Sequence, residues 1–571
     1  MSNDTAVPVT GQDPCCGTAE AAAQVNACCA PAAKADAIAA GADCCAPATT
    51  STVQVVAAPV RQAQPVPFAT PAGQPHELLP VVVIGAGPVG LAAAAHLHER
   101  GRPFLVLETG SDVGASVRQW GHVALFSPWR YNIDPAARRL LDAAGWAAPD
   151  DEALPTGAQL VEDYLQPLAK LPAIAAHLRF DAHVVAMSRV GVDRVHTAGR
   201  ADLPFVVRLA DGTDITASAV IDASGTWRTS NPLGVNGLPA HGEADLADLI
   251  DHALPDVLGA ARDAHADRHT VVVGSGHSAA NTLLDLARLA ETTPGTRITW
   301  AVRGGSAQRA FGGEADDQLP ARGALGSGLR TLVDTAKITL VEGFGVHTVR
   351  RAGERVELVA ADGRTVTADR VVSATGFRPD HSIAGELRLD LDPILGCTRT
   401  LADLIDPNEH SCGTVAPHGY NELSQPEPNY YAVGMKSYGR APTFLMATGY
   451  EQVRSIAAAL AGDFDDANDV QLDLPETGVC SSNLGAEAAA RDIAARFNLA
   501  PDVPVKLAAA TMALLPTAAS TGDAVRAAAE QIGLDPDIAL QIATLTQQPG
   551  ALPSVAGLIS LTPAAGGNCC T

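Results

Sequence analysis

The pattern of apolar and polar residues is most regular in the stretch from Val81 to Glu108. Four β-branched residues, Val81 to Ile84, predict a buried parallel strand, and a second apolar run, Phe104 to Leu107, predicts its neighbour. Three glycines and an alanine-rich helical pattern lie between the two runs. The order of strand, glycine turn, helix and strand therefore predicts a βαβ unit.

A second segment repeats this pattern and begins at Thr270. Its sequence, TVVVGSGHSAANTLLDLARL, predicts a strand, a glycine turn and a helix, and the following RITWAVRGG predicts the next strand. Two further strands that end in glycine turns are predicted in AVIDASGTW and in VVSATGFRPD, which contains Gly376. We expect the first of these strands to return the chain to the first sheet and the second to close the inserted domain.

The glycines of the first unit have the spacing of a dinucleotide site. Gly85 allows a tight turn, Gly87 lets a pyrophosphate approach the helix N-terminus, and Gly90 lets helix and strand pack closely. Glu108, at the end of the second strand, is placed to accept hydrogen bonds from a ribose diol. A transmembrane helix is the alternative, because Leu78–Ala95 carries no charge, but two prolines and three glycines in this run argue against it.

The glycine turn of the second unit reads G-x-G-x-x-A, with Gly274, Gly276 and Ala279. Arg303 follows its second strand, at the place where the first unit has Glu108. An acid at this place selects the free ribose hydroxyls, whereas an arginine accommodates a 2′-phosphate. The contrast favours NADPH over NADH, and an ordinary exposed cation is the alternative for Arg303.

The charge and composition of the chain exclude some classes of binding partner. A formal charge of −24 opposes binding to nucleic acids or anionic membranes, which requires a basic face. The sequence shows no signal-peptide pattern and no other membrane-spanning stretch, so we expect a cytoplasmic protein. The expected partner is a small-molecule or metal(loid) substrate, and the sequence leaves homodimer formation open.

Eight of the eleven cysteines occur in four adjacent pairs. Three pairs lie within residues 1 to about 75, an Ala-, Pro-, Thr- and Gln-rich segment that we predict to be a disordered tail. Because thiolates are soft ligands, the pairs are candidate sites for a soft metal or metalloid. Repeat expansion in a neutral tail and a general thiol-redox role are the alternatives. The paired residues are Cys15, Cys16, Cys28, Cys29, Cys44, Cys45, Cys569 and Cys570.

The two nested units, with an acid in the first and an arginine in the second, carry a family resemblance. Together with SATGFRP and the later YYAVGMKSYGRAPTFLMATGYEQ, they resemble the flavoproteins with two dinucleotide-binding domains. Within that group the chain is similar, over about residues 78 to 460, to flavin-binding monooxygenase-like proteins encoded in bacterial arsenic-resistance clusters. The resemblance implies FAD on the Gly85 unit and NADPH on the Gly274 unit. It also implies cofactor contacts at Gly376 and at a helix that starts near Gly449 and points its N-terminus at the flavin.

Aromatic residues cluster in the loop that follows the first unit, DVGASVRQWGHVALFSPWRYNID. Because aromatic residues are scarce in this chain, the ring residues of this loop are candidates to line the isoalloxazine ring of the flavin. A packing cluster is the alternative. The candidates are Trp120, His122, Trp129 and Tyr131.

The chain departs from the family pattern at three places. It lacks the F-x-G-x-x-x-H motif of better-known flavin monooxygenases, which makes oxygenation less secure than hydride transfer. It has no cysteine between Cys45 and Cys397, and so lacks the redox disulfide that disulfide reductases place beside the flavin. Related reductases hold the ribityl chain with a Gly-Asp pair, which reads Gly434-Met435 here.

The remaining candidates for chemistry lie in a Pro- and Gly-rich stretch that begins near Cys397. A thiolate at Cys412, with its pKa lowered by a neighbouring cation, could hold a soft substrate or act as a nucleophile. His418 and Lys436 complete the predicted catalytic set, and His410 lies in the same stretch. The alternative for each residue is a buried side chain with no role in the chemistry.

The predicted fold is α/β, with one Rossmann-like domain inserted in another. We assign the FAD-binding domain to residues 76–230 and 375–470, and the NADPH-binding domain to residues 231–374. Residues 471–571 form a helical region that ends in the last cysteine pair. Four helices are predicted there, in GAEAAARDIAARF, VKLAAATMALL, DAVRAAAEQIGL and DPDIALQIATL.

The expected function is that of an NADPH-dependent FAD oxidoreductase. We expect a monooxygenase that oxidises a soft nucleophile such as trivalent arsenic or a thiol. A flavin-dependent metal(loid) reductase is one alternative. A metal(loid)-binding or delivery protein built on a flavoprotein fold is the other.

Overall fold

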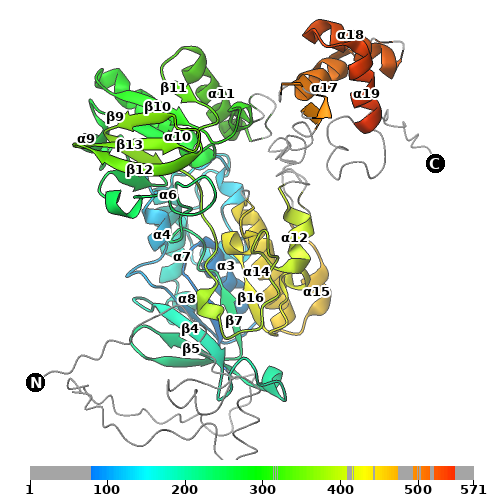
Figure 1. Ribbon diagram of the computed structural model, residues 1–571. Helices are drawn as coiled ribbons and strands as arrows, with labels where there is room; N and C mark the ends of the chain where they lie inside the picture. Colours follow the sequence, from blue (N-terminus) through cyan, green and yellow to red (C-terminus); the bar gives the residue numbers. More distant parts are fainter. Residues whose placement is uncertain are drawn as a thin grey trace, which may run out of the picture. The chain divides into compact units, whose positions relative to one another are not determined.

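The computed structural model describes the two predicted dinucleotide-binding regions and part of the C-terminal helical region (Figure 1). The predicted tail, the four cysteine pairs, His410 and Cys412 lie outside the described residues. The described residues are 79–312, 314, 317, 319–407, 415, 417–441, 444–472, 493–494, 496–497, 499–500, 503–514, 518 and 520–546.

The first predicted βαβ unit lies at the centre of a five-stranded parallel sheet with the order β16-β7-β1-β2-β3. Strand β1 (Val81–Ile84) pairs with β2 (Phe104–Leu107) on one side and with β7 (Ala219–Asp222) on the other. The edge strands are β3 (Leu178–Arg179) and β16 (Tyr430–Ala432). The predicted return of the chain to the first sheet through AVIDASG is therefore confirmed by β7.

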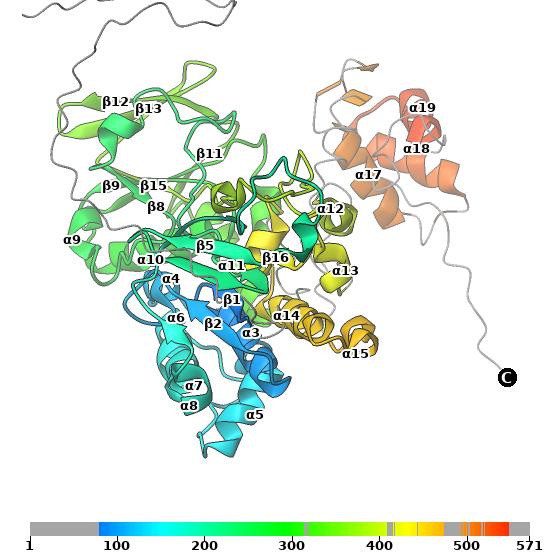
Figure 2. The same cartoon turned by 90° about the horizontal axis from the view of Figure 1, so that it is seen from below.

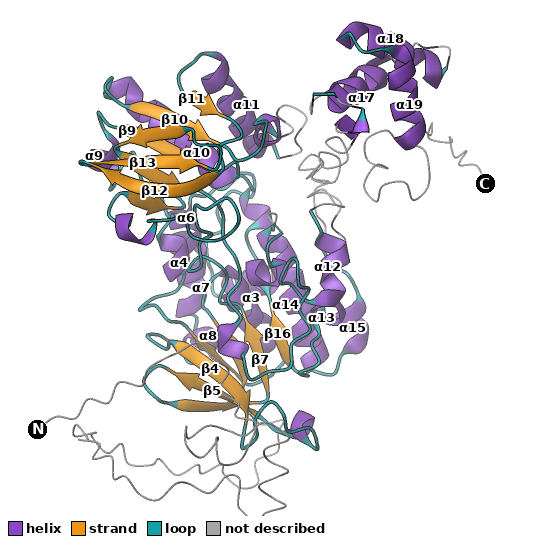
Figure 3. Cartoon of the chain, in the orientation of Figure 1, coloured by secondary structure: helices purple, strands orange, loops and turns teal. Residues whose placement is uncertain are grey.

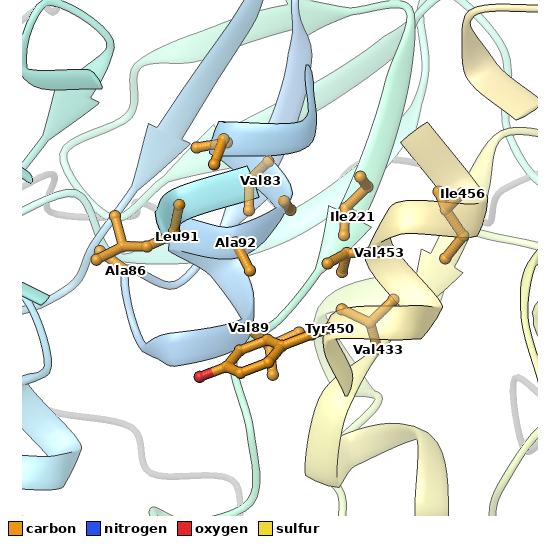
Figure 4. Packing of buried hydrophobic residues seen from close by; sticks show 14 of the residues in the cluster. Val83, Ala86, Val89, Leu91, Ala92, Ile221, Val433, Tyr450, Val453 and Ile456 are labelled. Carbon is orange, nitrogen blue, oxygen red and sulfur yellow. The ribbon is translucent and has the colours of Figure 1, made fainter. Parts of the chain in front are cut away.

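Two helices cover one face of this sheet, α3 (Pro88–Glu99) and α14 (Met446–Leu460), and they lie side by side in both views (Figures 1 and 2). Residues from Val89 to Leu97 of α3 are all buried, so this alanine-rich helix packs closely on several sides. Figure 4 shows apolar side chains of α3 and α14, among them Val453, against Ile221 of β7. This packing fixes the N-terminus of α3 at the carboxyl end of β1.

The second glycine unit forms a second five-stranded parallel sheet with the order β11-β10-β9-β15-β8 (Figure 3). Apolar residues of α10 (His277–Thr292) and α11 (Pro320–Asp334) form one buried cluster with strand residues such as Trp300. The strands are β8 (Ile250–His252), β9 (His269–Val273), β10 (Arg297–Ala301), β11 (Thr339–Val341) and β15 (Arg370–Ser373).

Two smaller antiparallel sheets are each built from three consecutive strands of the chain. The turn between β5 and β6 contains Gly212, whose φ of +86° suits a glycine in a tight turn. The strands are β4 (Val184–Arg189), β5 (Phe205–Leu209) and β6 (Asp214–Ala217) in one sheet, and β12 (Val346–Ala352), β13 (Arg355–Ala360) and β14 (Thr365–Ala368) in the other.

The chain passes between the two parallel sheets in two segments that bind each other. Ser230 and Phe377 form an antiparallel bridge, and the Asn231 amide donates to the Gly376 carbonyl over 2.8 Å. The predicted domain boundaries, between residues 230 and 231 and between 374 and 375, fall in these two segments. No helix of the described residues is long and apolar enough to span a bilayer.

Shorter helices connect these elements, and three C-terminal helices surround a small core of their own. Val525, Ala528 and Ile542 belong to that core. The first of the four predicted C-terminal helices lies mostly outside the described residues. The C-terminal helices are α17 (Val503–Leu514), α18 (Thr521–Ile532) and α19 (Pro536–Thr546). The shorter helices are α4 (Ala115–Arg118), α5 (Pro135–Ala143), α6 (Gly157–Gln159), α7 (Gln166–Lys170), α8 (Pro172–Ala175), α9 (Arg262–His265), α12 (Arg399–Ile405), α13 (Tyr420–Leu423) and α15 (Phe464–Asn468).

Candidate functional site

The turn between β1 and α3 is built from glycines for steric reasons. Gly85 has a φ of +100°, and a Cβ there would lie 2.8 Å from the Ala223 carbonyl oxygen. A Cβ on Gly90 would lie 1.9 Å from the Gly85 carbonyl oxygen. Since both distances are shorter than van der Waals contact, each position excludes a side chain, and the turn lies tightly against β7.

Gly87 differs from these two glycines because the space around it is open. A Cβ on Gly87 would meet nothing within 4 Å, and its φ of −82° is accessible to any residue. Gly87 is the N-cap of α3, and no side chain caps the helix. The first backbone N–H groups of α3 therefore face open space with the positive end of the helix dipole, as a pyrophosphate requires.

Glu108 is fixed at the end of β2 by the backbone. Its Oε2 accepts a hydrogen bond from the Ala86 amide over 2.8 Å, and its Oε1 accepts one from the Gly110 amide over 2.7 Å. The side chain is buried. Because each carboxylate oxygen can accept a second hydrogen bond, Glu108 can still bind a ribose diol. The residues of this turn thus fit the adenosine and pyrophosphate parts of FAD.

The second glycine turn repeats this geometry. A Cβ on Gly274 would lie 2.1 Å from the Ala374 carbonyl oxygen, whereas one on Gly276 would meet nothing within 4 Å. Gly276 is the N-cap of α10, again without a side-chain cap, and Ala279 is fully buried beneath the first turn. This turn also fits a dinucleotide pyrophosphate.

The strand ends of the two sites differ in charge. Arg303 follows β10 and is exposed, and among the described residues it makes no ion pair or hydrogen bond. The next residue, Gly304, accepts a hydrogen bond from the Gly343 amide over 2.7 Å, which holds the loop against its neighbour. An unpaired arginine on an ordered loop is suited to bind a phosphate.

Trp120 and Gly376, two predicted cofactor contacts, each have interactions within the protein. The Trp120 ring lies so close to Gly157 that a Cβ there would be 2.7 Å from it, and the ring also packs near Trp227, at 6.4 Å between centroids. Gly376, with a φ of +87°, lies in the second crossing segment. Trp120 thus has a packing role and Gly376 joins the two crossing segments, and cofactor contacts at these positions stay a prediction.

Helix α14 begins at Met446, three residues before Gly449, which we expected near its start. Gly449 instead lies at a close crossing of backbones, because a Cβ there would be 2.7 Å from the Val89 side chain and 3.5 Å from the Gly434 Cα. Gly434 has a φ of +66° and follows β16. The three residues bring the turn after β16 against the turn that carries Gly87.

His418 belongs to a buried hydrogen-bond network that holds this turn. Gln452 accepts from the Gly434 amide through Oε1 over 2.8 Å, which fixes the orientation of its side-chain amide. The Gln452 Nε2 then donates to His418 Nε2 and to Ser437 Oγ, each over 2.9 Å. His418 Nε2 is therefore an acceptor, and the imidazole carries its proton on Nδ1. Because Nε2 already accepts the hydrogen bond from Gln452, it is not free to remove a proton from a substrate.

Lys436 forms a buried ion pair at the carboxyl end of β7. Its Nζ lies 2.5 Å from Asp222 Oδ2 and donates to Ser224 Oγ over 3.1 Å, and both charged side chains are essentially inaccessible to water. Burial alone would raise the pKa of Asp222, but the Lys436 ammonium and hydrogen bonds from Ser224 outweigh it and lower the pKa. The pair ties the turn after Gly434 to the segment that contacts Gly85.

Cys397 is the one described cysteine, and it is buried. Burial raises its pKa to about 12, and the Asp392 carboxylate adds to the effect. It is a protonated thiol at neutral pH and is unsuited to nucleophilic chemistry. The predicted role of Cys412 lies outside the described residues.

Two residues that hold this region were missed in the sequence, Asp222 and Gln452. Asp222 is the single acid at the end of the apolar run AVID. An acidic residue at the end of a predicted buried strand could have indicated a buried ion pair. Gln452 gave no signal, because its partners His418 and Gly434 lie elsewhere in the chain.

The fold and the two glycine turns define a protein with two dinucleotide-binding domains of the flavoprotein type. Residues 82–392, more than half of the chain, match the sequence model of the pyridine nucleotide-disulphide oxidoreductase family. The chain belongs to this family.

The similarity extends to flavin monooxygenases. The flavin-containing monooxygenase FMO GS-OX-like 2 of Arabidopsis thaliana is 24% identical over 337 residues, which cover 54% of this chain and 63% of that protein. The bacillithiol disulfide reductase Bdr (YpdA) from Staphylococcus aureus matches with a TM-score of 0.48 and 17% identity, over 67% of this chain and 98% of that one. The cadaverine monooxygenase DfoA from Erwinia amylovora, bound to FAD, matches with a TM-score of 0.49 and 14% identity, over 70% of this chain and 97% of that one.

These findings confirm the predicted α/β fold class and place the chain in an oxidoreductase family. The chain spans less than two thirds of the length of the Arabidopsis thaliana relative. The predicted cofactors, FAD and NADPH, agree with this family. The resemblance to arsenic-resistance proteins, the substrate and the preference for NADPH are finer statements, and they belong to the proposal below.

Proposed function

We propose that the protein is an NADPH-dependent flavin monooxygenase that oxidises a soft nucleophile such as trivalent arsenic or a thiol. The observation that carries the proposal is the pair of open glycine turns with opposite charges at their strand ends. Gly87 with Glu108 suits FAD, and Gly276 with Arg303 suits a dinucleotide that carries a 2′-phosphate. The monooxygenase in the name of the Arabidopsis thaliana relative supports the same class.

The residues of the chain bind and orient the two cofactors. The N-termini of α3 and α10 hold the pyrophosphates, Glu108 accepts from the adenine ribose of FAD, and Arg303 pairs with the 2′-phosphate. FAD held by these residues would supply the redox chemistry, which is hydride acceptance from the nicotinamide and electron transfer to an acceptor.

The placement of cysteines supports a diffusible electron acceptor. No cysteine lies between Cys45 and Cys397 in the sequence, and the Cys397 thiol is buried and protonated. A protein of this family that passes electrons through its own disulfide needs two reactive thiols beside the flavin. Molecular oxygen needs no such pair, which favours oxygenation over reduction of a disulfide.

The cysteine pairs of the sequence support a soft substrate. Four pairs at the two ends of the chain are suited to collect a thiophilic ion, and Cys412 is our candidate for the thiol that holds it near the flavin. We also propose supporting roles for His418 and Lys436, which place the turn after β16. A metal(loid) reductase and a delivery protein remain the competing functions.

NADPH consumption with and without oxygen tests the proposal. Arsenite, an organoarsenical, mercuric ion and a simple thiol are each added to the purified protein under air and under nitrogen. We expect one of the soft nucleophiles to stimulate NADPH oxidation under air and to lose this effect without oxygen. Equal stimulation under nitrogen would support the reductase, and stoichiometric binding with no stimulation would support the delivery protein.

Replacing Arg303 with alanine tests the preference for NADPH. The variant loses a charge-assisted phosphate contact of about 1.5–3 kcal/mol, so we expect the KM for NADPH to rise by about 10- to 150-fold. The KM for NADH should stay within about twofold of the wild-type value. Arg297 lies at the opposite end of the same strand and is also exposed, and Arg297→Ala is the matched control. An equal loss with both dinucleotides would remove Arg303 from phosphate recognition.

A further inference from the structure

His277 is the first residue of α10 and directly follows Gly276, the open glycine of the second turn. Its side chain is half-buried, and among the described residues neither ring nitrogen makes a hydrogen bond. The backbone N–H groups beside it are those that face a dinucleotide pyrophosphate. An imidazole without a partner thus lies at the anion-binding end of a 16-residue helix.

The surroundings of His277 cover part of its ring and place one charge of each sign near it. The Phe126 ring, from the segment after α4, packs against the imidazole at 5.0 Å between centroids. On the α11 side lies a buried ion pair in which Arg322 donates to Asp317 over 2.7 and 2.8 Å. These two groups, Arg322 and Asp317, are the charges that act on the imidazole.

In the absence of an anion these surroundings favour the neutral imidazole. Burial lowers the pKa of His277 below its usual value, the Arg322 guanidinium lowers it further, and the Asp317 carboxylate opposes both. A pyrophosphate at the N-terminus of α10 would bring two negative charges near the ring, and nearby negative charge favours the protonated form of histidine.

We propose that His277 is a ligand for the pyrophosphate of the pyridine dinucleotide, and that its imidazole becomes protonated from solution as the dinucleotide binds. The proposal deepens the proposed function, because it rests on the assignment of this turn to the dinucleotide. The protonated imidazole then donates a charge-assisted hydrogen bond that its neutral form donates only weakly. Dinucleotide affinity is in this way linked to pH.

The direction of the pH dependence follows from the two states of His277. Its pKa is higher in the complex than in the free protein, so the gain in affinity is fully present below the pKa of the free protein. The gain is lost as the pH rises through the pKa of the complex. For a shift of one pKa unit, the total rise in the Kd for NADPH across this pH range is about tenfold.

Isothermal titration calorimetry of the FAD-loaded protein with NADPH, in two buffers of different ionisation enthalpy, measures the proton uptake directly. Wild-type proton uptake has one contribution from the 2′-phosphate of NADPH and one from His277. His277→Asn should abolish the second contribution and should reduce the dependence of the Kd for NADPH on pH. Comparing the variant with wild type removes the contribution of the ligand itself. His347→Asn is the matched control, because His347 is an exposed histidine on β12, outside the sheet that carries the second glycine turn, and it should behave as wild type.

A second variant keeps the test decisive if His277→Asn folds poorly. Phe126→Leu exposes the imidazole to water, so its pKa in the free protein should rise and the proton uptake near pH 7 should fall. Binding of NADPH with equal proton uptake in wild type and His277→Asn would overturn the inference. If wild-type protein binds neither NADPH nor NADH, the proposed function fails instead, and the two failures are thus distinguishable.

Discussion

Replacing Lys436 with methionine is expected to destabilise the fold by about 3–5 kcal/mol, because it leaves the Asp222 carboxylate buried without its partner. Lys436 is 1% exposed and Asp222 is 0% exposed, so water cannot replace the lost ammonium. The loss should also release FAD, since Asp222 precedes Ala223, the residue that contacts the Gly85 turn. Denaturation by urea and the FAD content after gel filtration measure the two effects.

Two comparisons identify the cause of the loss. Lys337 forms an exposed ion pair with Glu291 at 3.6 Å, and Lys337→Met should cost less than about 1 kcal/mol. Adding Asp222→Asn to Lys436→Met removes the unpaired charge and should recover part of the stability. If Lys436 acts only in catalysis, Lys436→Met would instead keep its stability and its FAD and lose only kcat.

The sequence predicts the elements whose signals are local. The runs from Val81 to Ile84 and from Phe104 to Leu107 become neighbouring parallel strands, because a short β-branched run before a glycine turn has few other ways to be buried. The spacing of Gly85, Gly87 and Gly90 predicts a different role for each glycine: a tight turn, the approach of a pyrophosphate and close packing of helix and strand. The structure adds the clearances, because Gly85 and Gly90 have no room for a Cβ whereas Gly87 has open space around it.

The interactions that hold the region after β16 could not be predicted, because they join distant parts of the chain. Lys436 and Asp222 are 214 residues apart, and Gln452 and His418 meet only because α13 and α14 pack together. A stretch rich in histidine, cysteine and lysine suggests catalysis in the sequence. In the structure, the described members of this stretch are buried and serve hydrogen bonding or packing.

Replacing Gly87 with alanine is expected to remove FAD while leaving the fold intact. A Cβ at this position meets no protein atom within 4 Å, and the backbone conformation is accessible to alanine, so the stability of the FAD-free protein should change by less than about 1 kcal/mol. The methyl group would lie where the pyrophosphate approaches α3. Loss of two charge-assisted hydrogen bonds, each about 1.5–3 kcal/mol, predicts at least a hundredfold rise in the Kd for FAD.

Gly90→Ala is the opposite case and serves as the contrast. Its Cβ would lie 1.9 Å from the Gly85 carbonyl oxygen, so the backbone must move, and we expect loss of stability together with loss of FAD. The thermal midpoint of each FAD-free variant and a fluorescence titration with FAD measure the two properties separately. A Gly87→Ala protein that binds FAD within threefold of wild type would show that the flavin binds elsewhere.

The same substitution in the second turn should separate the two cofactors. Gly276, like Gly87, is an N-cap surrounded by open space, so Gly276→Ala should leave both the fold and the yellow colour of bound FAD unchanged. Its N–H groups face the pyridine dinucleotide, and we therefore expect NADPH to reduce the flavin at least a hundredfold less efficiently, whereas dithionite should still reduce it fully. Loss of FAD from Gly276→Ala with normal reduction of any FAD that remains would reverse the assignment of the two turns.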